Sequence, residues 1–499
     1  MSFLYVIFVT LLVILLVVAS YALYIVHRRK KFSHIPGPRV ASFFSGNLPD
    51  LRNNLKAGRP SDQIFLDWHK MYGKVICTWF YHSPFLSIAD PDIIKELLIT
   101  KNLPKGDFAY DPVANVYGKR CLGHGLATET DHQKWSKRRK IFNPAFHRVC
   151  LKDMMKAFNS SADLFIQKLL EKADGKTEVV MVDEFARATL DVLCKVAFGT
   201  DLNIINDPNC KFTKSVTTML DGMETAALHP FGWMNPLNWP YQSKVRSAID
   251  FIRKSGKKII EVRQLAINHG EQVPNDILQH ILAIAEEDPT ADIEDMLDEF
   301  VTFFVAGHET TANKLSFCVM ELADHSEILE ELVQEVFEVL GDRTTVHFDD
   351  LAKMHHMGEV LKETLRLYPS ATGTIRVTEK DEMIGGKLVP AGTTLMFSSY
   401  ITGRYPEYWP NAEDFNPLRF EDMDGDKRSH FTYFPFSVGP RNCIGQHFAQ
   451  IEAKVILSRF IQTFKFRLVP GQTKQITEKM TIRPRDGVIC TLVPRHVVT

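Results

Sequence analysis

One short segment, which runs Phe-Ser-Val-Gly-Pro-Arg-Asn-Cys-Ile-Gly from Phe436 to Gly445, constrains this chain more than any other. It places a cysteine, Cys443, between Arg441 and Gly445 and downstream of Gly439. Small residues let backbone N–H groups approach a sulfur and stabilise the negative charge of a thiolate. The alternative is a buried loop cysteine that binds nothing. The segment favours a loop that presents Cys443 as a thiolate ligand for a metal.

The same segment suits the iron of a haem. Arg441 can reach a haem propionate, and Phe436 can pack over the porphyrin and shield the sulfur from water. The pattern F-x-x-G-x-R-x-C-x-G resembles the haem-thiolate loop of the cytochrome P450 family, in which a cysteine thiolate holds the haem iron. The resemblance implies haem b as the cofactor, Cys443 as the iron ligand, and Phe436, Arg441 and Gly445 as cofactor-binding residues.

A second segment, residues 292–321, is typical of one long apolar helix, interrupted by Ala306-Gly-His-Glu-Thr-Thr311. A glycine beside two threonines weakens a buried helix locally. Thr310 can also hydrogen-bond the Ala306 carbonyl and bend the helix, which would open a pocket for dioxygen and water. An ordinary buried helix with a mild kink is the alternative. A zinc-protease helix fails, since Ala312 stands where its second histidine would be.

Within this interruption, Glu309 and Thr310 offer an acid and a hydroxyl. Splitting the O–O bond of dioxygen needs two protons, delivered without flooding the site. The two residues resemble the acid–alcohol pair of P450 monooxygenases, which implies that Thr310 hydrogen-bonds dioxygen and that Glu309 relays protons. We therefore expect an oxidoreductase that inserts one oxygen atom from O2 into a C–H bond.

Glu363 and Arg366 lie three residues apart in an apolar setting, so they share one helical face. Such pairs are usually surface salt bridges that contribute little. With the later Phe415-Asn-Pro-Leu-Arg-Phe420, they resemble the E-x-x-R helix and the F-x-P-x-R-F loop of the P450 family. The resemblance implies a buried structural network of Glu363, Arg366 and Arg419 that supports the cysteine loop.

The two propionates of a haem need cations or indole N–H groups. Trp135-Ser-Lys-Arg-Arg139 resembles the W-x-x-x-R helix of the family, which implies that Trp135 and Arg139 face a propionate. Arg441 and Arg376 are the further candidates. For any single arginine the alternative is a solvated surface charge.

The same helix also carries Lys137, Arg138 and Lys140, which must point partly away from the haem if Arg139 points at it. Cations on the cysteine side would attract an acidic redox partner. The family resemblance implies NADPH–cytochrome P450 reductase as that partner, and the alternative is a solvated basic face.

The stretch from Phe3 to Val26 carries no charge and exceeds the roughly 20 apolar residues that cross a bilayer. His27-Arg-Arg-Lys-Lys31 follows, and no Lys or Arg precedes the stretch, so the positive-inside rule places the body of the chain in the cytosol. A cleaved signal peptide is the alternative. We expect a transmembrane anchor over 3–26, a basic and proline-rich linker over 27–38 and a catalytic domain over 39–499. The protein would cross the endoplasmic reticulum membrane once.

The chain has 499 residues and a net charge of −1. A charge this close to zero gives no overall electrostatic attraction for nucleic acid. Hydrophobic periodicity predicts a mainly α fold with small β-sheets, and the resemblance makes this the P450 fold behind a single transmembrane helix. Strands are expected at 75–80 and 85–89 and within 378–395, where Gly385-Gly386 marks a hairpin turn. Helical patterns cover residues 62–72, 151–171, 184–198, 243–270 and 293–323.

By family analogy, the segments that line the substrate pocket are 105–125, 219–239, 299–306, 370–375 and 479–484. The second suits either an access channel near the bilayer or plain core. Its apolar residues are Met223, Leu228, Phe231, Trp233, Met234, Leu237 and Trp239.

A membrane-fed apolar pocket suits a lipophilic substrate such as a lipid. Within the family, the resemblance is to the cholesterol 24-hydroxylases, which implies a sterol, although Thr372 and Ile375 stand where two aromatic residues are expected. The alternative is a fatty-acid or xenobiotic hydroxylase of broad specificity. Other classes left open are a haem-thiolate isomerase or dehydratase that needs no O2, a haem-based sensor or lipid-binding protein, and a structural membrane protein without haem.

Overall fold

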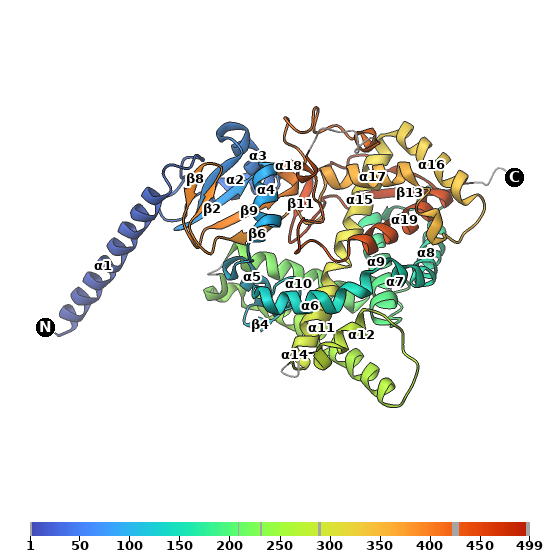
Figure 1. Cartoon of the computed structure of the whole chain (residues 1–499), viewed down its shortest axis with the longest axis horizontal. Helices are drawn as coiled ribbons and strands as arrows, with labels where there is room; N and C mark the ends of the chain where they lie inside the picture. Colours follow the sequence, from blue (N-terminus) through green and yellow to red (C-terminus); the bar gives the residue numbers. More distant parts are fainter. Residues whose placement is uncertain (1, 208, 230–231, 288–290, 422–428, 496–499) are drawn as a thin grey trace. The chain divides into compact units, whose positions relative to one another are not determined.

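The computed structural model describes the chain except for residues 1, 208, 230–231, 288–290, 422–428 and 496–499 (Figure 1). Its contacts divide the chain into two compact units. The sheet unit consists of residues 1–104, 373–412 and 429–433. The helical unit consists of residues 105–372, 413–428 and 434–499.

The sheet unit is built on one twisted sheet of four strands, with short helices before and after the strands. Its elements are α1 (Ser2–Lys31), α2 (Leu48–Lys56), α3 (Ser61–Tyr72), β1 (Val75–Phe80), β2 (Ser83–Ile88), α4 (Pro91–Lys95), β6 (Gly373–Val377), β7 (Glu382–Ile384), β8 (Lys387–Val389), β9 (Thr394–Ser398) and α18 (Ser399–Thr402).

The strands of this sheet follow the order β1-β2-β9-β6, in which β2 and β9 are parallel and the other pairs antiparallel. Leu66 and Trp68 of α3 pack with Ile76 and Phe85 of the sheet in its core. The expected strands at 75–80 and 85–89 are β1 and β2. The glycine pair at 385–386 joins β7 to β8 with φ of +56° and +73°, a conformation that only glycine adopts freely, which confirms the predicted hairpin.

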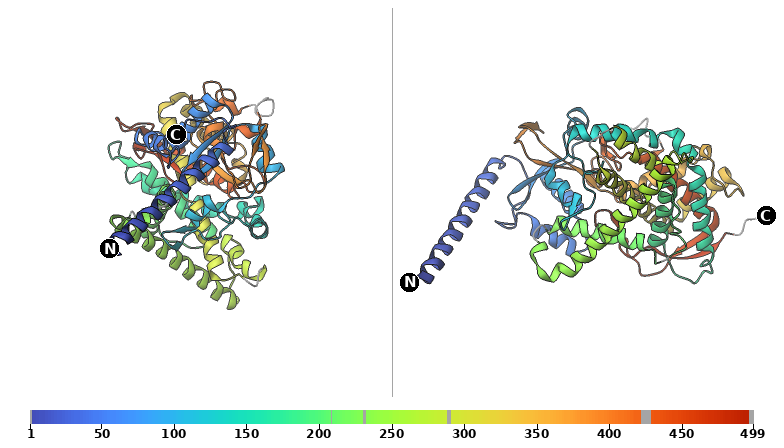
Figure 2. Two further views of the ribbon diagram at one scale, coloured as in Figure 1. Left: turned by 90° about the vertical axis from the view of Figure 1, so that its left-hand side faces the viewer. Right: turned by 90° about the horizontal axis from the view of Figure 1, so that it is seen from below.

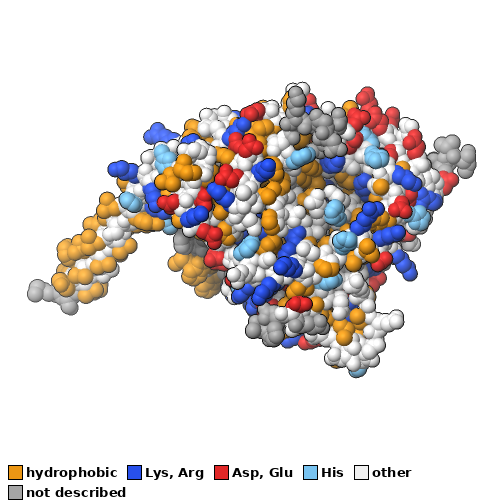
Figure 3. Space-filling view, in the orientation of Figure 1, with side chains coloured by type: hydrophobic (Ala, Val, Ile, Leu, Met, Phe, Trp, Pro, Cys, Tyr) orange, Lys and Arg blue, Asp and Glu red, His pale blue; other side chains and the backbone are white. Residues whose placement is uncertain are grey.

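The N-terminal helix α1 is longer than the predicted anchor. It continues through the basic cluster to Lys31, because lysine and arginine are good helix formers and suit the negative end of the helix dipole. Among the described residues, Phe3–Lys31 is the helix long and apolar enough to cross a membrane. Hydrophobic side chains cover most of its surface in Figure 3, as lipid would require.

The helical unit carries most of the chain in a succession of helices and short strands. Its helices are α5 (Asp107–Ala114), α6 (His132–Phe142), α7 (Arg148–Asp153), α8 (Met155–Leu170), α9 (Met181–Phe198), α10 (Lys211–Leu228), α11 (Trp239–Asn268), α12 (Ile277–Leu282), α13 (Ile284–Glu287), α14 (Ile293–Ala306), α15 (Glu309–Asp324), α16 (Ser326–Leu340), α17 (His355–Leu367) and α19 (Gln446–Thr463). Its strands are β3 (Asn115–Val116), β4 (Lys119–Arg120), β5 (Val179–Val180), β10 (Phe464–Leu468), β11 (Ile476–Glu478), β12 (Ile482–Pro484) and β13 (Ile489–Pro494).

The five expected helices all form, with two differences. The helix expected over 151–171 is two helices, α7 and α8, which join at Met154. The helix expected to begin at 243 begins at Trp239, where Pro240 suits a first turn that has no need of its N–H. The helix expected over 293–323 is interrupted between Ala306 and Glu309, as the sequence predicts.

Helices α14 and α15 follow one another through the middle of the helical unit (Figures 1 and 2). Helix α15 contacts α9, α17, α19 and β12, and nearly all of its side chains are buried. Polar side chains are buried along the helix together with the apolar ones, among them Asn313, Lys314 and Glu321. Buried polar groups need hydrogen-bond partners, which the neighbouring elements must supply.

Candidate functional site

The cysteine loop is held by its own backbone. The N–H of Cys443 donates to the carbonyl of Phe436 at 2.8 Å, and the N–H of Asn442 donates to that of Gly439 at 3.1 Å. Ser437 and Gly439 both adopt positive φ, +59° and +79°. These turns place Cys443 shortly before helix α19, which begins at Gln446.

All eight cysteines lie in the described part of the chain, and Cys443 alone is exposed; Cys150 is half-buried and the others are buried. A Cβ atom at Gly445 would lie 3.9 Å from the Cys443 sulfur. The surrounding protein limits the solvation of this accessible sulfur, which raises the pKa of the Cys443 thiol, whereas the Gly445 N–H and the Arg139 guanidinium lower it. An accessible sulfur beside a backbone N–H and a cation fits a thiolate ligand of haem iron.

Arg139, which was expected to face a haem propionate, contacts the cysteine loop in the structure. Its guanidinium donates to the carbonyl and side-chain oxygens of Asn442 at 2.6 and 2.9 Å, and to Asn143 at 2.9 Å. A guanidinium has five N–H donors, so these three bonds leave donors for a propionate. Arg139 therefore holds the residue next to Cys443, and its contact with a propionate remains a prediction.

Trp135 and Arg441 lie against each other, and both are buried. The Arg441 guanidinium carbon is 4.4 Å from the centre of the indole ring, and one of its N–H groups donates to the Glu129 carbonyl at 2.6 Å. This cation–π contact brings together Trp135 and Arg441, both of which are predicted to bind a propionate. Their contact with a haem remains a prediction.

Arg376 lies in the sheet unit, on β6, and is buried. It donates to the Thr374 hydroxyl at 2.5 Å and to the Ile375 carbonyl at 2.8 Å. Its role toward a haem also remains a prediction.

The break between α14 and α15 has the predicted cause. The Thr310 hydroxyl donates to the Ala306 carbonyl at 2.9 Å. A side chain at Gly307 would meet Leu193 of α9 at 2.8 Å, so glycine is required for close packing there. Ala306 is exposed and Thr310 half-buried, although the rest of α15 is almost wholly buried. The break therefore leaves the Ala306 carbonyl and the Thr310 hydroxyl partly accessible where a buried helix begins.

Glu309 is buried, and its carboxylate accepts a hydrogen bond from the Thr481 hydroxyl at 2.8 Å. Burial raises the pKa of Glu309, while Thr481, Arg483 and Lys479 lower it. The sequence placed residues 479–484 near the pocket but gave no signal for Thr481 as the partner of the acid, because a single threonine has no distinctive pattern.

Two more of the segments expected to line the pocket meet at Ser370. Its hydroxyl donates to the Thr310 carbonyl at 2.7 Å, and its own carbonyl accepts from the Ile482 N–H at 3.0 Å. These bonds tie the segment after α17, the start of α15 and the β12 strand together.

The predicted ion pair of Glu363 and Arg366 is present on α17. The Arg366 side chain donates to both carboxylate oxygens at 2.7 Å, and both side chains are 0 % exposed. Arg419 approaches the same carboxylate at 3.4 Å, the Asn416 N–H donates to it at 2.9 Å, and Arg366 also donates to the Asp414 carbonyl at 3.0 Å. A buried charge pair is stable only when its remaining hydrogen-bonding groups are satisfied, and here the segment 414–419 supplies the partners.

Arg138 was expected on an exposed basic face, and the structure corrects this. It pairs with Asp295 at 2.9 Å and with the buried Glu299 at 3.4 Å, both on α14. Burial raises the pKa of Glu299 to about 8, and Arg138 lowers it. Of the three cations expected on this face, Lys137 and Lys140 are exposed.

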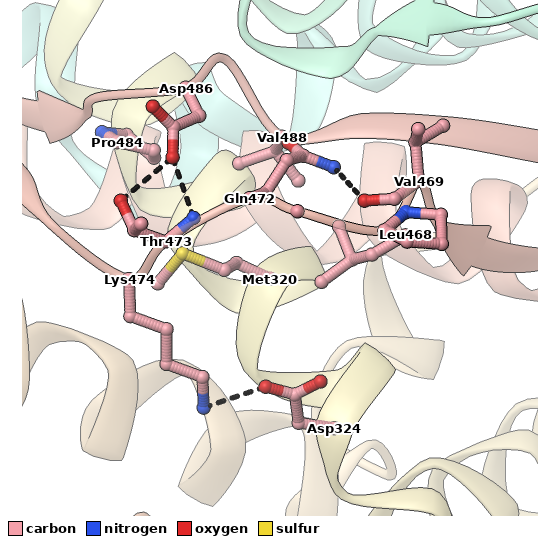
Figure 4. Close-up of a pocket in the computed structure, with 12 residues that line it drawn as sticks. Met320, Asp324, Leu468, Val469, Gln472, Thr473, Lys474, Pro484, Asp486 and Val488 are labelled. Carbon is pink, nitrogen blue, oxygen red and sulfur yellow. Dashed lines mark hydrogen bonds and ion pairs between the residues drawn. The ribbon is translucent and has the colours of Figure 1, made fainter.

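A separate pocket of about 260 Å³ lies between the C-terminal end of α15 and the last strands (Figure 4). Met320 and Asp324 of α15 line it together with Leu468 and Lys474, and Lys474 pairs with Asp324 at 3.0 Å. Its lining includes none of the residues of the candidate site.

A mainly helical fold with one accessible loop cysteine, and a helix broken beside an acid and an alcohol, defines a haem-thiolate protein. The family model described as Cytochrome P450 matches residues 35–491, and the chain belongs to the cytochrome P450 family. It is 31% identical to cytochrome P450 4d2 of Drosophila melanogaster, over 94% of this chain and 95% of that protein. It is 29% identical to cytochrome P450 3A29 of Sus scrofa, over 98% and 96%, and 30% identical to cytochrome P450 3A28 of Bos taurus, over 92% and 90%.

Membership of this family makes the protein a monooxygenase and an oxidoreductase, with haem held through a cysteine thiolate. It also implies O2, a redox partner and a lipophilic substrate.

We predict that Glu363→Gln destabilises the protein by about 3–5 kcal/mol, because it leaves the buried Arg366 charge without its carboxylate. The purified variant should carry much less haem per chain than wild type. Haem absorbance per protein and a urea unfolding curve measure the two effects.

The matched control is Glu359→Gln, one turn earlier on α17 and half-buried. It should leave haem content and stability close to wild type. Normal haem content in Glu363→Gln would show that the pair does not support the cofactor site.

Proposed function

We propose that this protein is a membrane-anchored monooxygenase that hydroxylates a lipophilic substrate, in the first place a sterol. The observation that carries the proposal is the accessible Cys443 sulfur, in the same unit as Glu309 and Thr310 at the helix break. The bound haem supplies the oxidation of a C–H bond by O2 and two electrons. The chain supplies the ligand, the binding site and the protons.

Each residue of the site has a distinct task in this proposal. Cys443 holds the iron as a thiolate, and Arg139 and the Gly445 N–H stabilise the charge on its sulfur. Trp135, Arg376 and Arg441 bind the propionates, and Phe436 packs over the porphyrin. The Thr310 hydroxyl donates a hydrogen bond to the Ala306 carbonyl. In this proposal it rotates away from that carbonyl and donates its proton toward the bound substrate oxygen, O2. The Glu309 carboxyl then returns a proton to the Thr310 oxygen.

The substrate reaches the site from the membrane. The connection between α10 and α11 exposes large apolar side chains: Trp233 and Trp239 are each 58 % exposed and Leu237 is 87 % exposed. Met223 is core, and Phe231 lies outside the described residues. Exposed tryptophans and leucine suit the boundary between headgroups and acyl chains. We propose the endoplasmic reticulum membrane, a single span at 3–26, a linker at 27–38 and a cytosolic catalytic domain at 39–499.

A sterol fits a membrane-fed apolar pocket, and the resemblance to cholesterol 24-hydroxylases supports it. Thr372 and Ile375 are both half-buried and smaller than the aromatic residues expected there. Their size favours a wider pocket, which keeps a fatty-acid or xenobiotic hydroxylase as the second candidate.

Titration of the full-length ferric holoenzyme with cholesterol, followed at the Soret band, tests the substrate class. We expect a saturable shift to the high-spin form with cholesterol and a weaker one with a long-chain fatty acid. A shift with the fatty acid alone, in protein whose carbon monoxide spectrum shows thiolate ligation, would favour the second candidate.

We predict that Thr310→Ala keeps haem and substrate binding but releases hydrogen peroxide in place of product, because the hydroxyl that donates protons is gone. Peroxide formed per NADPH consumed measures the leak. Thr310→Ser keeps the hydroxyl and should stay close to wild type. Unchanged coupling in Thr310→Ala would remove this residue from proton delivery.

We propose NADPH–cytochrome P450 reductase as the redox partner and the exposed Lys137 and Lys140 of α6 as part of its docking surface. The double reversal Lys137→Glu and Lys140→Glu should slow reduction of the haem. The loss should be larger at low salt, since about 0.1 M salt screens charges beyond roughly 10 Å. Stopped-flow reduction at two ionic strengths measures it.

The charge-matched control reverses Lys254 and Lys258, which are exposed on α11. It should leave the rate of reduction unchanged. Equal slowing by both double variants, or slowing that does not depend on salt, would count against docking at α6.

A further inference from the structure

The turn between β11 and β12 makes a directed hydrogen bond to the acid of the site. The Thr481 hydroxyl accepts a hydrogen bond from the Asn313 side-chain amide at 3.1 Å and donates to Glu309 at 2.8 Å. A hydroxyl has one proton, and an NH₂ group can only donate. The proton of Thr481 is therefore directed at the Glu309 carboxylate, and the acid cannot turn without breaking this bond.

The same turn is also tied to α10. Lys479 forms an ion pair with Asp221, in the middle of α10, and the two side chains are only 19 % and 33 % exposed. The Lys479 N–H donates to the Thr481 carbonyl at 2.9 Å, so the residues that bind the two helices are joined by the backbone of one tight turn. A displacement of α10 would thus pull on the residue that orients Glu309.

The charges around Glu309 come from these two elements. Lys479 and Arg483 of the β11–β12 hairpin favour the ionised carboxyl and lower its pKa, while Asp221 of α10 raises it. Glu224, one turn further along α10, is half-buried; burial above all raises its pKa to about 7, where Lys479 and Arg483 lower it and Asp221 and Glu309 raise it. Asp221 and Lys479 therefore act on Glu309 with opposite signs.

We propose that Thr481 is a positioning residue for Glu309. We also propose that the Lys479–Asp221 ion pair makes proton delivery depend on whether α10 is packed against the β11–β12 turn. This inference rests on the proposed proton-relay role of Glu309. With α10 seated, the turn holds the carboxyl in one orientation. When α10 lifts, the turn is released and the acid loses both its hydrogen bond and its charge environment.

The test compares Thr481→Val, which keeps the shape but removes the hydroxyl, with Thr481→Ser, which keeps the hydroxyl. In the full-length ferric holoenzyme, the infrared C=O stretch of the protonated Glu309 carboxyl is followed against pH and assigned by its loss in Glu309→Gln. Because Thr481 donates to the ionised form, its loss should move the titration midpoint of Glu309 up by about one pH unit. Thr481→Ser should titrate as wild type does.

A further variant, Asp221→Asn, tests the link to α10. Removing the Asp221 charge would by itself lower the Glu309 midpoint, whereas releasing the turn from α10 takes away the Thr481 hydrogen bond and raises it. We expect the midpoint to rise. A fall would mean that Asp221 acts on Glu309 through its charge alone, and that result would overturn the dependence on α10. The carbon monoxide spectrum checks that every variant is folded and loaded.

Peroxide release per NADPH separates this inference from the proposed function. Thr481→Val should leak several-fold more peroxide than wild type, and Thr481→Ser should not. An unchanged Glu309 midpoint in Thr481→Val, with Thr310→Ala still leaking, would overturn the role of Thr481 alone. A shifted midpoint with unchanged coupling would overturn the relay role of Glu309.

Discussion

We expect the candidate site to depend on the fully buried ion pair of Glu363 and Arg366. Two charges taken out of water gain little unless every remaining donor and acceptor finds a partner. Here the backbone of Asp414 and Asn416, with the side chain of Arg419, completes the set. The pair therefore fixes a segment of irregular chain to a rigid helix, far along the sequence from both of them. Irregular backbone that is anchored in this way can lead into a loop of defined shape, such as the one that carries Cys443.

Further polar contacts of the helical unit hold the cysteine loop and helix α14 in place. Helix α6 braces the cysteine loop through Arg139 and Asn442, and it clamps α14 through Arg138. The break between α14 and α15 leaves Thr310 half-buried at the start of α15, whose following side chains are almost all buried. Arginine suits both tasks on α6, because its planar fork reaches two oxygens at once.

Some of this could be predicted from the sequence, namely the parts that are local or repeat a recognisable pattern. The bond from Thr310 to Ala306 joins residues four apart, and the pair of Glu363 and Arg366 joins residues three apart on one turn. The cysteine loop is closed by bonds within the segment from Phe434 to Cys443.

The contacts that could not be predicted join residues distant in sequence that carry no local signature. The Arg139 bond to Asn442 spans 303 positions, and the Thr481 bond to Glu309 spans 172. A basic helix gives no sign of which arginine will meet a carboxylate from elsewhere, so Arg138 was placed on the surface. The substrate is set by the shape of a pocket, which no single residue such as Thr372 encodes.

The consecutive arginines of α6 have a consequence for how this chain can change. Residues next to each other on a helix point about 100° apart, so Arg138 reaches α14 while Arg139 reaches the cysteine loop. One residue inserted upstream in the helix would rotate both arginines by about 100° in the same sense, so that Arg138 would point where Arg139 points now and Arg139 would point away from both partners. Helix α6 can therefore tolerate substitutions on its exposed face, but its length and phase are fixed by geometry, and any variation in length must fall in the loops that flank it.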